Sequence, residues 1–206
     1  MMIAVVDYGA GNLASVVNAL ERLGATACVT RDAAVIRRAS GVLVPGVGAA
    51  TDIMAHLTRH GLVPVLRQVI ADGTPFLGVC MGMQALLSVS YEGGEQRCLG
   101  VIPGAVRRLP GGQPLPHVGW NQVNQVRPVP LFTGIPDGAE FYFVHSYYVD
   151  PATPEWTAAT TEYGLRFTSV IARDNVMGTQ FHPEKSGRWG LQLLRNFAHM
   201  AGAAGR

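Results

Sequence analysis

Short apolar runs alternate with amphipathic stretches through the first hundred residues. Four of the runs have the composition and length of buried strands: Ile3–Asp7, Ala27–Thr30, Val42–Val44 and Phe76–Val79. After the first run, Leu13–Leu23 carries apolar residues at helical spacing and ends at Gly24. Strands that alternate with helices predict crossover connections, which build a mostly parallel sheet with helices on both faces.

Three further segments have helical character. Ile53–Ile70 predicts a helix that is interrupted near Gly61 and Pro64, since glycine and proline both weaken a helix interior. Gly82–Ser88 predicts a helix directly after the fourth strand, and Gly190–Met200 predicts a closing helix.

The pattern changes after Gly100. Prolines and glycines are crowded between residues 103 and 136, and the strand-like runs that follow the change are Val118–Val126, Glu140–Val149 and Ser169–Ala172. Turn residues separate these runs, which predicts antiparallel hairpins added to the sheet. No repeat, low-complexity tract or linker divides the sequence. We therefore expect residues 1–206 to form a single α/β domain with an open, mostly parallel sheet and antiparallel hairpins in its second half.

Composition excludes several classes of protein. Of 206 residues, 48% are hydrophobic and 15% are charged, which is the balance of a globular chain and not of a disordered, fibrous or coiled-coil one. The net charge is +2 and the densest basic run is Arg107-Arg108, so we expect no nucleic-acid partner. The apolar start meets Asp7 without a basic leader, and no stretch approaches the roughly 20 apolar residues of a membrane span. We expect no signal peptide, no membrane association and a cytoplasmic location.

The three cysteines, Cys28, Cys80 and Cys98, have neither an even number nor a Cys-x-x-Cys spacing. A disulfide framework, a zinc site and any other metal are therefore not expected. Cys80 differs from the other two because Gly78-Val79-Cys80-Met81-Gly82 follows a buried strand and precedes a helix. In that context a glycine-flanked nucleophile forms a tight elbow at the end of the sheet, and the helix start favours a thiolate. We interpret Cys80 as a nucleophile, with a buried structural thiol as the alternative.

A thiol nucleophile needs a base and a group that orients the base. Of the six histidines, His182 stands in Gln180-Phe181-His182-Pro183-Glu184-Lys185, where the proline favours extended backbone. Residues two apart in an extended chain project to the same side, so Glu184 can reach the His182 imidazole. A surface turn is the alternative. We expect the other histidines to be solvated (His56, His60 and His199), or structural or lining the site (His117 and His145).

Two glycine-containing loops follow the first and third strands. Pro45-Gly46-Val47-Gly48-Ala49 can turn a backbone N–H toward a developing oxyanion, although it is also an ordinary strand-to-helix loop. Gly9-Ala10-Gly11-Asn12-Leu13-Ala14 fits the G-x-G-x-x-A pattern of dinucleotide-binding turns, for which Asp32 would be the acidic partner. A tight turn that needs glycine explains the same residues. Because loops after parallel strands meet at one edge of a sheet, we expect the site at that edge.

With Cys80, His182 and Glu184 in that order, the sequence resembles the class I (triad) glutamine amidotransferases, which implies a flavodoxin-like α/β fold. Six segments look like those of the glutaminase subunits of imidazole glycerol phosphate synthase: Asp7–Asn12, Pro45–Gly48, Gly78–Gln84, His117–Asn121, Phe143–Tyr148 and Gln180–Ser186. They span nearly the whole chain, and Ala10 is a small departure in the first of them. The resemblance displaces the dinucleotide interpretation, since the context of a short motif decides what it does.

The resemblance implies a role for each matching position. Cys80 is the nucleophile, His182 the acid–base and Glu184 its orienter, while the oxyanion donors are the backbone N–H groups of Met81 and, after a peptide flip, of Val47. The positions that hold glutamine are Gly48, Gln84, Glu92, Ser146 and Tyr147. The positions near a subunit interface are Asn12, Trp120 and Lys185.

The resemblance also implies a function and a partner. The chain would hydrolyse L-glutamine to glutamate and ammonia without a cofactor, as one half of a heterodimer. The ammonia would pass to a (β/α)8-barrel cyclase subunit, which converts PRFAR to imidazole glycerol phosphate and AICAR in L-histidine biosynthesis. Two alternatives stay open: a glutaminase that serves another synthase, such as pyridoxal phosphate synthase, and a catalytically silent binding subunit.

Overall fold

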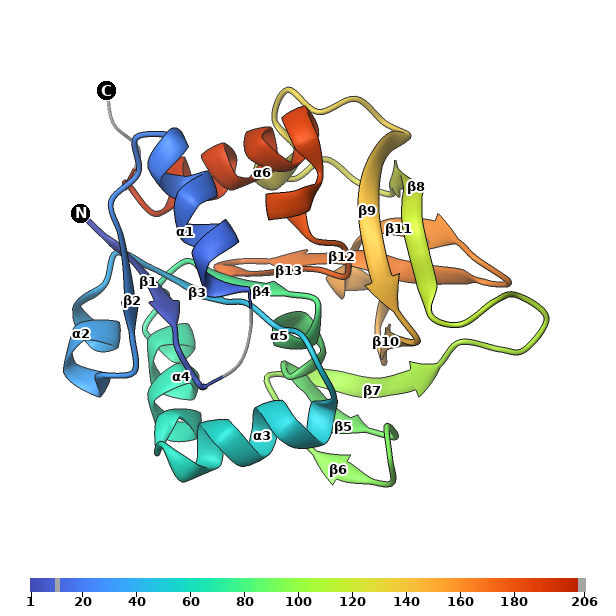
Figure 1. Ribbon diagram of the computed structural model, residues 1–206, viewed down its shortest axis with the longest axis horizontal. Coiled ribbons are helices and arrows are strands. Elements are labelled where there is room, and N and C mark those ends of the chain that lie inside the picture. Colours follow the sequence, from blue (N-terminus) through green and yellow to red (C-terminus); the bar gives the residue numbers. More distant parts are fainter. Residues whose placement is uncertain (10–11, 204–206) are drawn as a thin grey trace.

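The computed structural model describes residues 1–9 and 12–203, and it shows an open sheet between two layers of helices (Figure 1). Five parallel strands form the centre in the order β2-β1-β3-β4-β13. Their bounds are Ile3–Val6 (β1), Ala27–Thr30 (β2), Gly41–Val44 (β3), Phe76–Val79 (β4) and Val176–Thr179 (β13). All but the edge strand β2 are buried along their whole length, which is why their sequences are continuous apolar runs.

Helices cover both faces of these strands. On one side lie α1 (Leu13–Arg22) and α6 (Gly187–Met200), which pack against each other (Figure 1). On the other side lie α3 (Ala50–Arg59) and α4 (Leu62–Ala71), with the short helix α2 (Ala33–Arg38) packed against α4. The crossover arrangement predicted from the sequence therefore holds for the first half of the chain.

The helical segment predicted at Ile53–Ile70 is two helices. Gly61 adopts a left-handed backbone (φ 65°, ψ 22°) between α3 and α4, so the interruption falls at the glycine. Pro64 lies within the first turn of α4, where the N–H that proline lacks would have no helical partner in any case.

The second half of the chain extends the sheet with mainly antiparallel strands. The path continues from β13 through β12, β10, β7, β5 and β6, and β11, β8 and β9 form a branch from β12. The bounds are Leu87–Ser90 (β5), Gln96–Arg97 (β6), Ile102–Arg108 (β7), His117–Gln125 (β8), Ala139–His145 (β9), Tyr147–Pro151 (β10), Thr157–Glu162 (β11) and Arg166–Arg173 (β12). Short 3-10 turns stand between β8 and β9 (η1, Pro130–Phe132), between β10 and β11 (η2, Pro154–Trp156) and between β13 and α6 (η3, Pro183–Lys185).

Several predicted boundaries were wrong. The helix expected at Gly82–Ser88 is the single turn α5 (Met81–Gln84), and Leu87 begins the strand β5 instead, because this segment pairs with both β7 and β6. The strand expected at Glu140–Val149 is two strands that separate at Ser146 and pair with different neighbours. The predicted elements did not include α2, β7, β11 or β13.

The predicted fold class is confirmed: the sheet is open and parallel at its centre, with helices on both faces and antiparallel strands added in the second half. Loops that follow β1, β3, β4 and β13 meet at one edge of the parallel centre, the carboxyl edge where open α/β sheets bind ligands. Across residues 1–9 and 12–203, the helices are all too short or too polar to cross a membrane.

Candidate active site

Cys80 stands on a sharp turn between β4 and α5. Its backbone has φ 52° and ψ −108°, a conformation that residues with side chains rarely adopt and that marks strain at a functional position. The flanking glycines are required by close packing, since a Cβ on Gly82 would lie 2.0 Å from the Val44 carbonyl oxygen. A Cβ on Gly78 would lie 2.5 Å from the Gly82 carbonyl oxygen. The turn thus has the geometry of a nucleophile elbow.

His182 follows β13, the strand next to the one that carries Cys80. Its Nδ1 lies 2.8 Å from Glu184 Oε1, and both side chains are almost completely buried. Burial by itself would lower the pKa of His182, but its interactions with Cys80 and Glu184 outweigh burial and raise the pKa to about 9. The structure brings the three predicted triad residues together, with the carboxylate on Nδ1 of the imidazole and the thiol as its other polar neighbour.

Two buried polar atoms of the triad lack a hydrogen-bond partner among the described residues. His182 Nε2 and Glu184 Oε2 are buried and make no hydrogen bond of regular geometry to the described residues. Because Nδ1 faces Glu184, Nε2 is the nitrogen available to exchange a proton at the sulfur.

A cavity of about 380 Å³ opens in front of Cys80. Its wall includes both loops predicted to supply oxyanion donors and all five positions predicted to hold glutamine. The lining residues are Val47, Gly48, Cys80, Met81, Gln84, Glu92, Pro116, Val144, His145, Ser146, Tyr147 and Lys185. The volume lies in the range of small-ligand sites and suits a free amino acid.

The two predicted oxyanion donors have different surroundings. Met81 is the first residue of α5, so its N–H has no partner within the helix and remains available beside the nucleophile. Val47 is 39% exposed in the loop after β3. Its N–H faces the buried Tyr8 hydroxyl: burial raises the pKa of Tyr8, and the Val47 N–H offsets part of that rise. The Tyr8 hydroxyl makes no hydrogen bond of regular geometry to the described residues, so nothing fixes the Val47 amide in its present orientation.

Gln84 supplies a buried acceptor to the cavity. Its Nε2 donates to the Tyr147 carbonyl at 2.9 Å and to Gln180 Oε1 at 3.1 Å. Its own Oε1 is buried without a hydrogen-bond partner among the described residues. An unpaired buried acceptor is costly, and a ligand that donates an N–H removes that cost. The carboxyl-bearing Glu92 lines the same cavity, so the site suits a ligand with an ammonium group.

Of the three positions predicted near an interface, Lys185 is at this cavity and the other two lie elsewhere. Lys185 lines the cavity, and its Nζ lies 6.0 Å from the centre of the Tyr142 ring. Trp120 is 55% exposed and meets the edge of the same ring. Asn12 is half-buried just before α1, a helix that packs against η3, the turn that holds Glu184 and Lys185. Lys185 and Trp120 are thus neighbours across Tyr142, while Asn12 is connected to them through α1.

Two site residues were not foreseen from the sequence. Gln180 is fully buried with its Nε2 3.7 Å from Cys80 Sγ, and the Tyr8 hydroxyl contacts the Val47 loop. His182 itself is extended, as predicted, but Glu184 reaches it from the 3-10 turn η3, and Gln180 and Phe181 lie in a bend. The alternation expected of an extended chain therefore does not account for either contact, and the sequence held no signal for Gln180. For Tyr8 the sequence held no signal either.

The other two cysteines have structural surroundings. The Cys28 thiol donates to the carbonyl of its neighbour Val29, and the Cys98 thiol donates to the Gln96 carbonyl. Burial raises the pKa of Cys98 to about 11, which keeps this thiol protonated and unreactive at neutral pH.

Other polar residues singled out in the sequence have structural tasks. Asp32 caps α2 by accepting from the Ala34 and Val35 N–H groups, so its carboxylate is not free to bind a ribose. Ala10 and Gly11 of the glycine motif lie outside the described residues. His56 was expected to be solvated, which was wrong: it is half-buried, and its Nδ1 lies 2.8 Å from the Tyr8 carbonyl.

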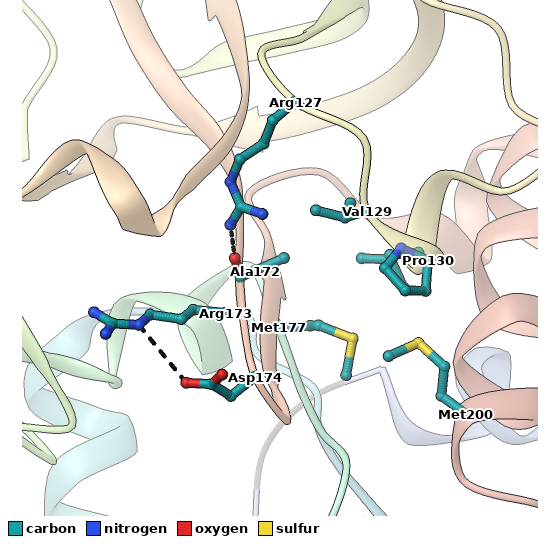
Figure 2. A pocket seen from close by; sticks show the side chains of 9 residues that line it. Arg127, Val129, Pro130, Ala172, Arg173, Asp174, Met177 and Met200 are labelled. Carbon is teal, nitrogen blue, oxygen red and sulfur yellow. Dashed lines mark hydrogen bonds and ion pairs between the residues drawn. The ribbon is translucent and has the colours of Figure 1, made fainter.

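A second, smaller cavity of about 90 Å³ lies between β12, β13, η1 and α6 (Figure 2). It shares no lining residue with the cavity at Cys80. The Arg127 guanidinium there donates to the Ala172 carbonyl, and Arg173 pairs with Asp174 at 3.6 Å (Figure 2). These charges are already paired and the remaining wall is apolar, so this cavity has no chemistry comparable to the first. No cluster of three metal-ligating side chains occurs within the described ranges.

Known proteins with similar sequences and structures support one assignment. The profile of the glutamine amidotransferase class-I family matches residues 4–201. The imidazole glycerol phosphate synthase subunit HisH of Moorella thermoacetica is 53% identical over 98% of this chain and 97% of its own length. The HisH subunit of Chloroflexus aurantiacus is 55% identical over the same shares.

Solved structures extend the likeness to the fold. A crystal structure of a glutamine amidotransferase superposes with a TM-score of 0.77 at 21% identity, covering 97% of this chain and 98% of that one. A glutamine amidotransferase from Thermotoga maritima has a TM-score of 0.70 at 15% identity and covers 98% of both chains. The chain therefore belongs to the class I glutamine amidotransferase family, among the HisH subunits of imidazole glycerol phosphate synthase.

Proposed function

We propose that this chain is the glutaminase subunit of an imidazole glycerol phosphate synthase. It hydrolyses L-glutamine to glutamate and ammonia through Cys80, His182 and Glu184. The observation that carries the proposal is the buried Glu184–His182 hydrogen bond beside a strained Cys80 that opens onto an amino-acid-sized cavity. The HisH relatives, about half identical over nearly the full chain, support the place of this reaction in histidine biosynthesis.

The reaction proceeds through a thioester. The Cys80 thiolate attacks the side-chain carboxamide carbon of glutamine, and the N–H groups of Met81 and Val47 hold the resulting oxyanion. One such donor is commonly worth about 10²–10³ in rate. His182 protonates the departing ammonia and then takes a proton from the water that hydrolyses the thioester. Glu184 keeps the imidazole oriented and stabilises its charged form without becoming protonated itself.

The substrate is held by the wall of the cavity. Gln84 Oε1, which has no hydrogen-bond partner among the described residues, accepts from the α-ammonium group of glutamine, and Glu92, which lines the same cavity, adds a negative charge. The backbone around Gly48, Ser146 and Tyr147 completes the pocket. The neutral carboxamide end then reaches the sulfur.

The Val47 peptide gives the partner a means of control. Val47 lies in an exposed loop whose amide needs the partner to hold it toward the cavity, so we expect the glutaminase activity of the lone chain to be low. The partner and its ligand raise activity by holding the Val47 peptide toward the cavity. This arrangement prevents wasteful glutamine hydrolysis when no acceptor for ammonia is bound.

The partner that the HisH relatives imply is a cyclase subunit, which we propose to be a (β/α)8 barrel in a heterodimer with this chain. Lys185 belongs to the docking face because it lines the cavity in which ammonia forms. Trp120 belongs to it because it is 55% exposed and packs on Tyr142, the ring that Lys185 also approaches. Asn12 belongs to it through α1, which packs on η3. A closed path into the barrel keeps ammonia unprotonated until it reacts with PRFAR to give imidazole glycerol phosphate and AICAR.

We further propose that residues 1–206 act as one glutamine amidotransferase domain in the cytoplasm. The three cysteines are free thiols, which is the state that a reducing compartment maintains. Neither step of the proposed reaction requires a metal or another cofactor, because the thiol, the imidazole and backbone donors supply all of the chemistry.

The decisive experiment separates ammonia production from ammonia use. In the complex with the cyclase, Cys80→Ala should abolish glutamine-dependent synthesis and leave synthesis from added ammonium salt intact. Cys98→Ala, which removes another buried thiol, is the matched control and should retain both activities. Loss of both activities in Cys80→Ala would mean that Cys80 is structural, and retention of both would refute the proposal.

The docking face has its own test. Lys185→Ala should weaken the stimulation of glutaminase activity by the cyclase ligand more than it lowers the unstimulated rate. Unchanged stimulation would remove Lys185 from the interface.

A further inference from the structure

Gln180 is a buried polar side chain in contact with the nucleophile. It is fully inaccessible to solvent, and its Nε2 donates to Cys80 Sγ at 3.7 Å. It comes from the chain between β13 and η3, which also delivers His182. Two side chains of one short segment, Gln180 and His182, therefore reach the same sulfur.

The orientation of the Gln180 side-chain amide follows from the Tyr147 backbone carbonyl. The Tyr147 carbonyl can only accept, so the Gln84 atom that lies 2.9 Å from it must be the NH2 group. That same NH2 group lies 3.1 Å from Gln180, which must therefore present its oxygen to Gln84. The remaining end of the Gln180 amide, its NH2 group, faces the sulfur. The hydrogen bonds from Gln84 to Tyr147 and Gln180 therefore decide which end of the Gln180 amide is the NH2 group that faces Cys80.

The same carbonyl is held from the other side by two histidines. His145 Nδ1 donates to Tyr147 at 2.8 Å, so His145 Nε2 accepts from His117 Nδ1 at 2.9 Å. His117 Nε2 in turn accepts from the Asn121 amide at 3.2 Å, and that amide also donates to the Glu162 carbonyl. Each imidazole is fixed as one neutral tautomer. The carbonyl that orients the two glutamines is therefore itself held rigidly.

The thiolate needs this donor because its surroundings offer few others. Cys80 is 3% exposed, so water provides little solvation for a negative sulfur. The sequence suggested that the dipole of the following helix would stabilise the thiolate, but α5 is a single turn of four residues and its dipole is correspondingly small. The side-chain donors close to the sulfur are the His182 imidazole and the Gln180 N–H, while the Met81 N–H is the donor assigned to the oxyanion.

We propose that Gln180 is a catalytic residue whose side-chain N–H stabilises the Cys80 thiolate, and that it connects the nucleophile to the substrate-binding Gln84. The inference rests on the proposed glutaminase function and deepens it. The hydrogen bond strengthens when the sulfur is charged and weakens when the sulfur becomes part of a neutral thioester. Gln180 thus favours the reactive form of Cys80 in the resting enzyme, and substrate binding at Gln84 is transmitted to it through one shared amide.

The test uses the full chain in its complex and the pH dependence of Cys80 alkylation. Gln180→Met keeps the length and volume of the side chain without the N–H donor, and Gln180→Glu keeps the shape while replacing the donor by a carboxylate. Iodoacetamide modification of Cys80 is followed by peptide mass spectrometry, so that Cys28 and Cys98 do not contribute. Gln113→Leu, which changes an exposed glutamine, is the control.

In Gln180→Met the midpoint of alkylation should move upward by about one pH unit, as loss of a hydrogen bond to a charged group implies. Gln180→Glu should move it further, and glutamine-dependent turnover should fall roughly 10-fold or more in both. Ammonium-dependent synthesis should stay at the wild-type level and shows that the complex is folded. A midpoint in both variants equal to that of Gln113→Leu would overturn the inference. The proposed function would fail on a different result, namely glutamine-dependent synthesis that survives Cys80→Ala.

Discussion

Replacing Gly82 with alanine tests the contact between the nucleophile elbow and the strand that leads into the oxyanion loop. In the structure a Cβ at this position would lie 2.0 Å from the Val44 carbonyl oxygen and 2.9 Å from the Val44 carbonyl carbon. Real Cβ atoms essentially never approach closer than 3.0 Å, so α5 and the end of β3 have to separate by about 1 Å. Val44 directly precedes the Pro45–Gly48 loop, and the separation therefore moves the Val47 donor away from Cys80.

Two effects of that displacement can be estimated. A misplacement of about 1 Å at reacting groups costs roughly 10²-fold in rate, so glutamine hydrolysis by the complex should fall by about that factor. Overpacking of a dense interior costs about 1–3 kcal/mol of unfolding free energy, which lowers Tm by roughly 2–12 °C in a chain of this size. The loss of activity should exceed what the fraction unfolded at the assay temperature explains.

Glutaminase kinetics of the complex are measured at a temperature well below the Tm of both the wild type and Gly82→Ala, and the two Tm values are measured by thermal unfolding. Gly111→Ala is the matched control, because its Cβ would meet no described atom within 4 Å beyond its chain neighbours and its backbone is outside the left-handed region. Wild-type kcat and Tm in Gly82→Ala would refute the close contact on which the elbow and the oxyanion loop depend.

Three further predictions concern the titrating groups and the triad. Cys80→Ala should lower the pKa of His182 from about 9, because it removes an interaction that favours the imidazolium. An NMR titration of the histidines measures this pKa, with Cys98→Ala as the control. A His182 pKa that stays the same in Cys80→Ala would contradict the contact between the two side chains. Burial lowers the pKa of His117 to about 4 and of His145 to about 3, both below the unfolded value of about 6.5, so the unfolded chain binds more protons in acid. This contribution to stability is intact above about pH 6.5 and is lost as the pH falls. The unfolding free energy measured with urea should therefore decrease by about 2 kcal/mol between pH 7 and 5.5, and the decrease should be smaller in His117→Asn. An unfolding free energy that does not change over this pH range would refute the prediction. Glu184→Gln should reduce kcat by roughly 10²-fold or more while KM changes little, since Glu184 contacts His182 and does not line the cavity. An unchanged kcat in steady-state assays would show that Glu184 is not part of the triad.

The parallel half of the fold was predictable because its signals are local. Buried strands such as Ile3–Val6 read as uninterrupted apolar runs, and the helices between them have a clear apolar stripe. The second half was less predictable because its strands are set by pairing between distant residues. β7 contains Pro103 and Gly104 and carries no strand signal of its own, yet it pairs along its length with β10 more than forty residues later.

The catalytic positions were predictable for a different reason. The tight turn at Cys80 requires glycine at positions 78 and 82, and both glycines can be recognised in the sequence. His182 and Glu184 are two residues apart in one segment. The network behind them was not predictable in the same way. His117, His145 and Gln84 meet only because β8, β9 and α5 come together in space, and no spacing in the sequence relates them. Gln180 belongs to the same segment as His182, but the bend at Gln180 and Phe181 had no signal in the sequence.

The central claim is that one of three cysteines is an activated nucleophile that recognises glutamine. Incubation of the complex with the glutamine analogue 6-diazo-5-oxonorleucine, followed by peptide mass spectrometry, tests it directly. We predict a single covalent adduct on Cys80, none on Cys28 or Cys98, protection by excess glutamine, and loss of labelling in His182→Ala. Equal labelling of Cys98, or no labelling of Cys80 in the active complex, would contradict the account.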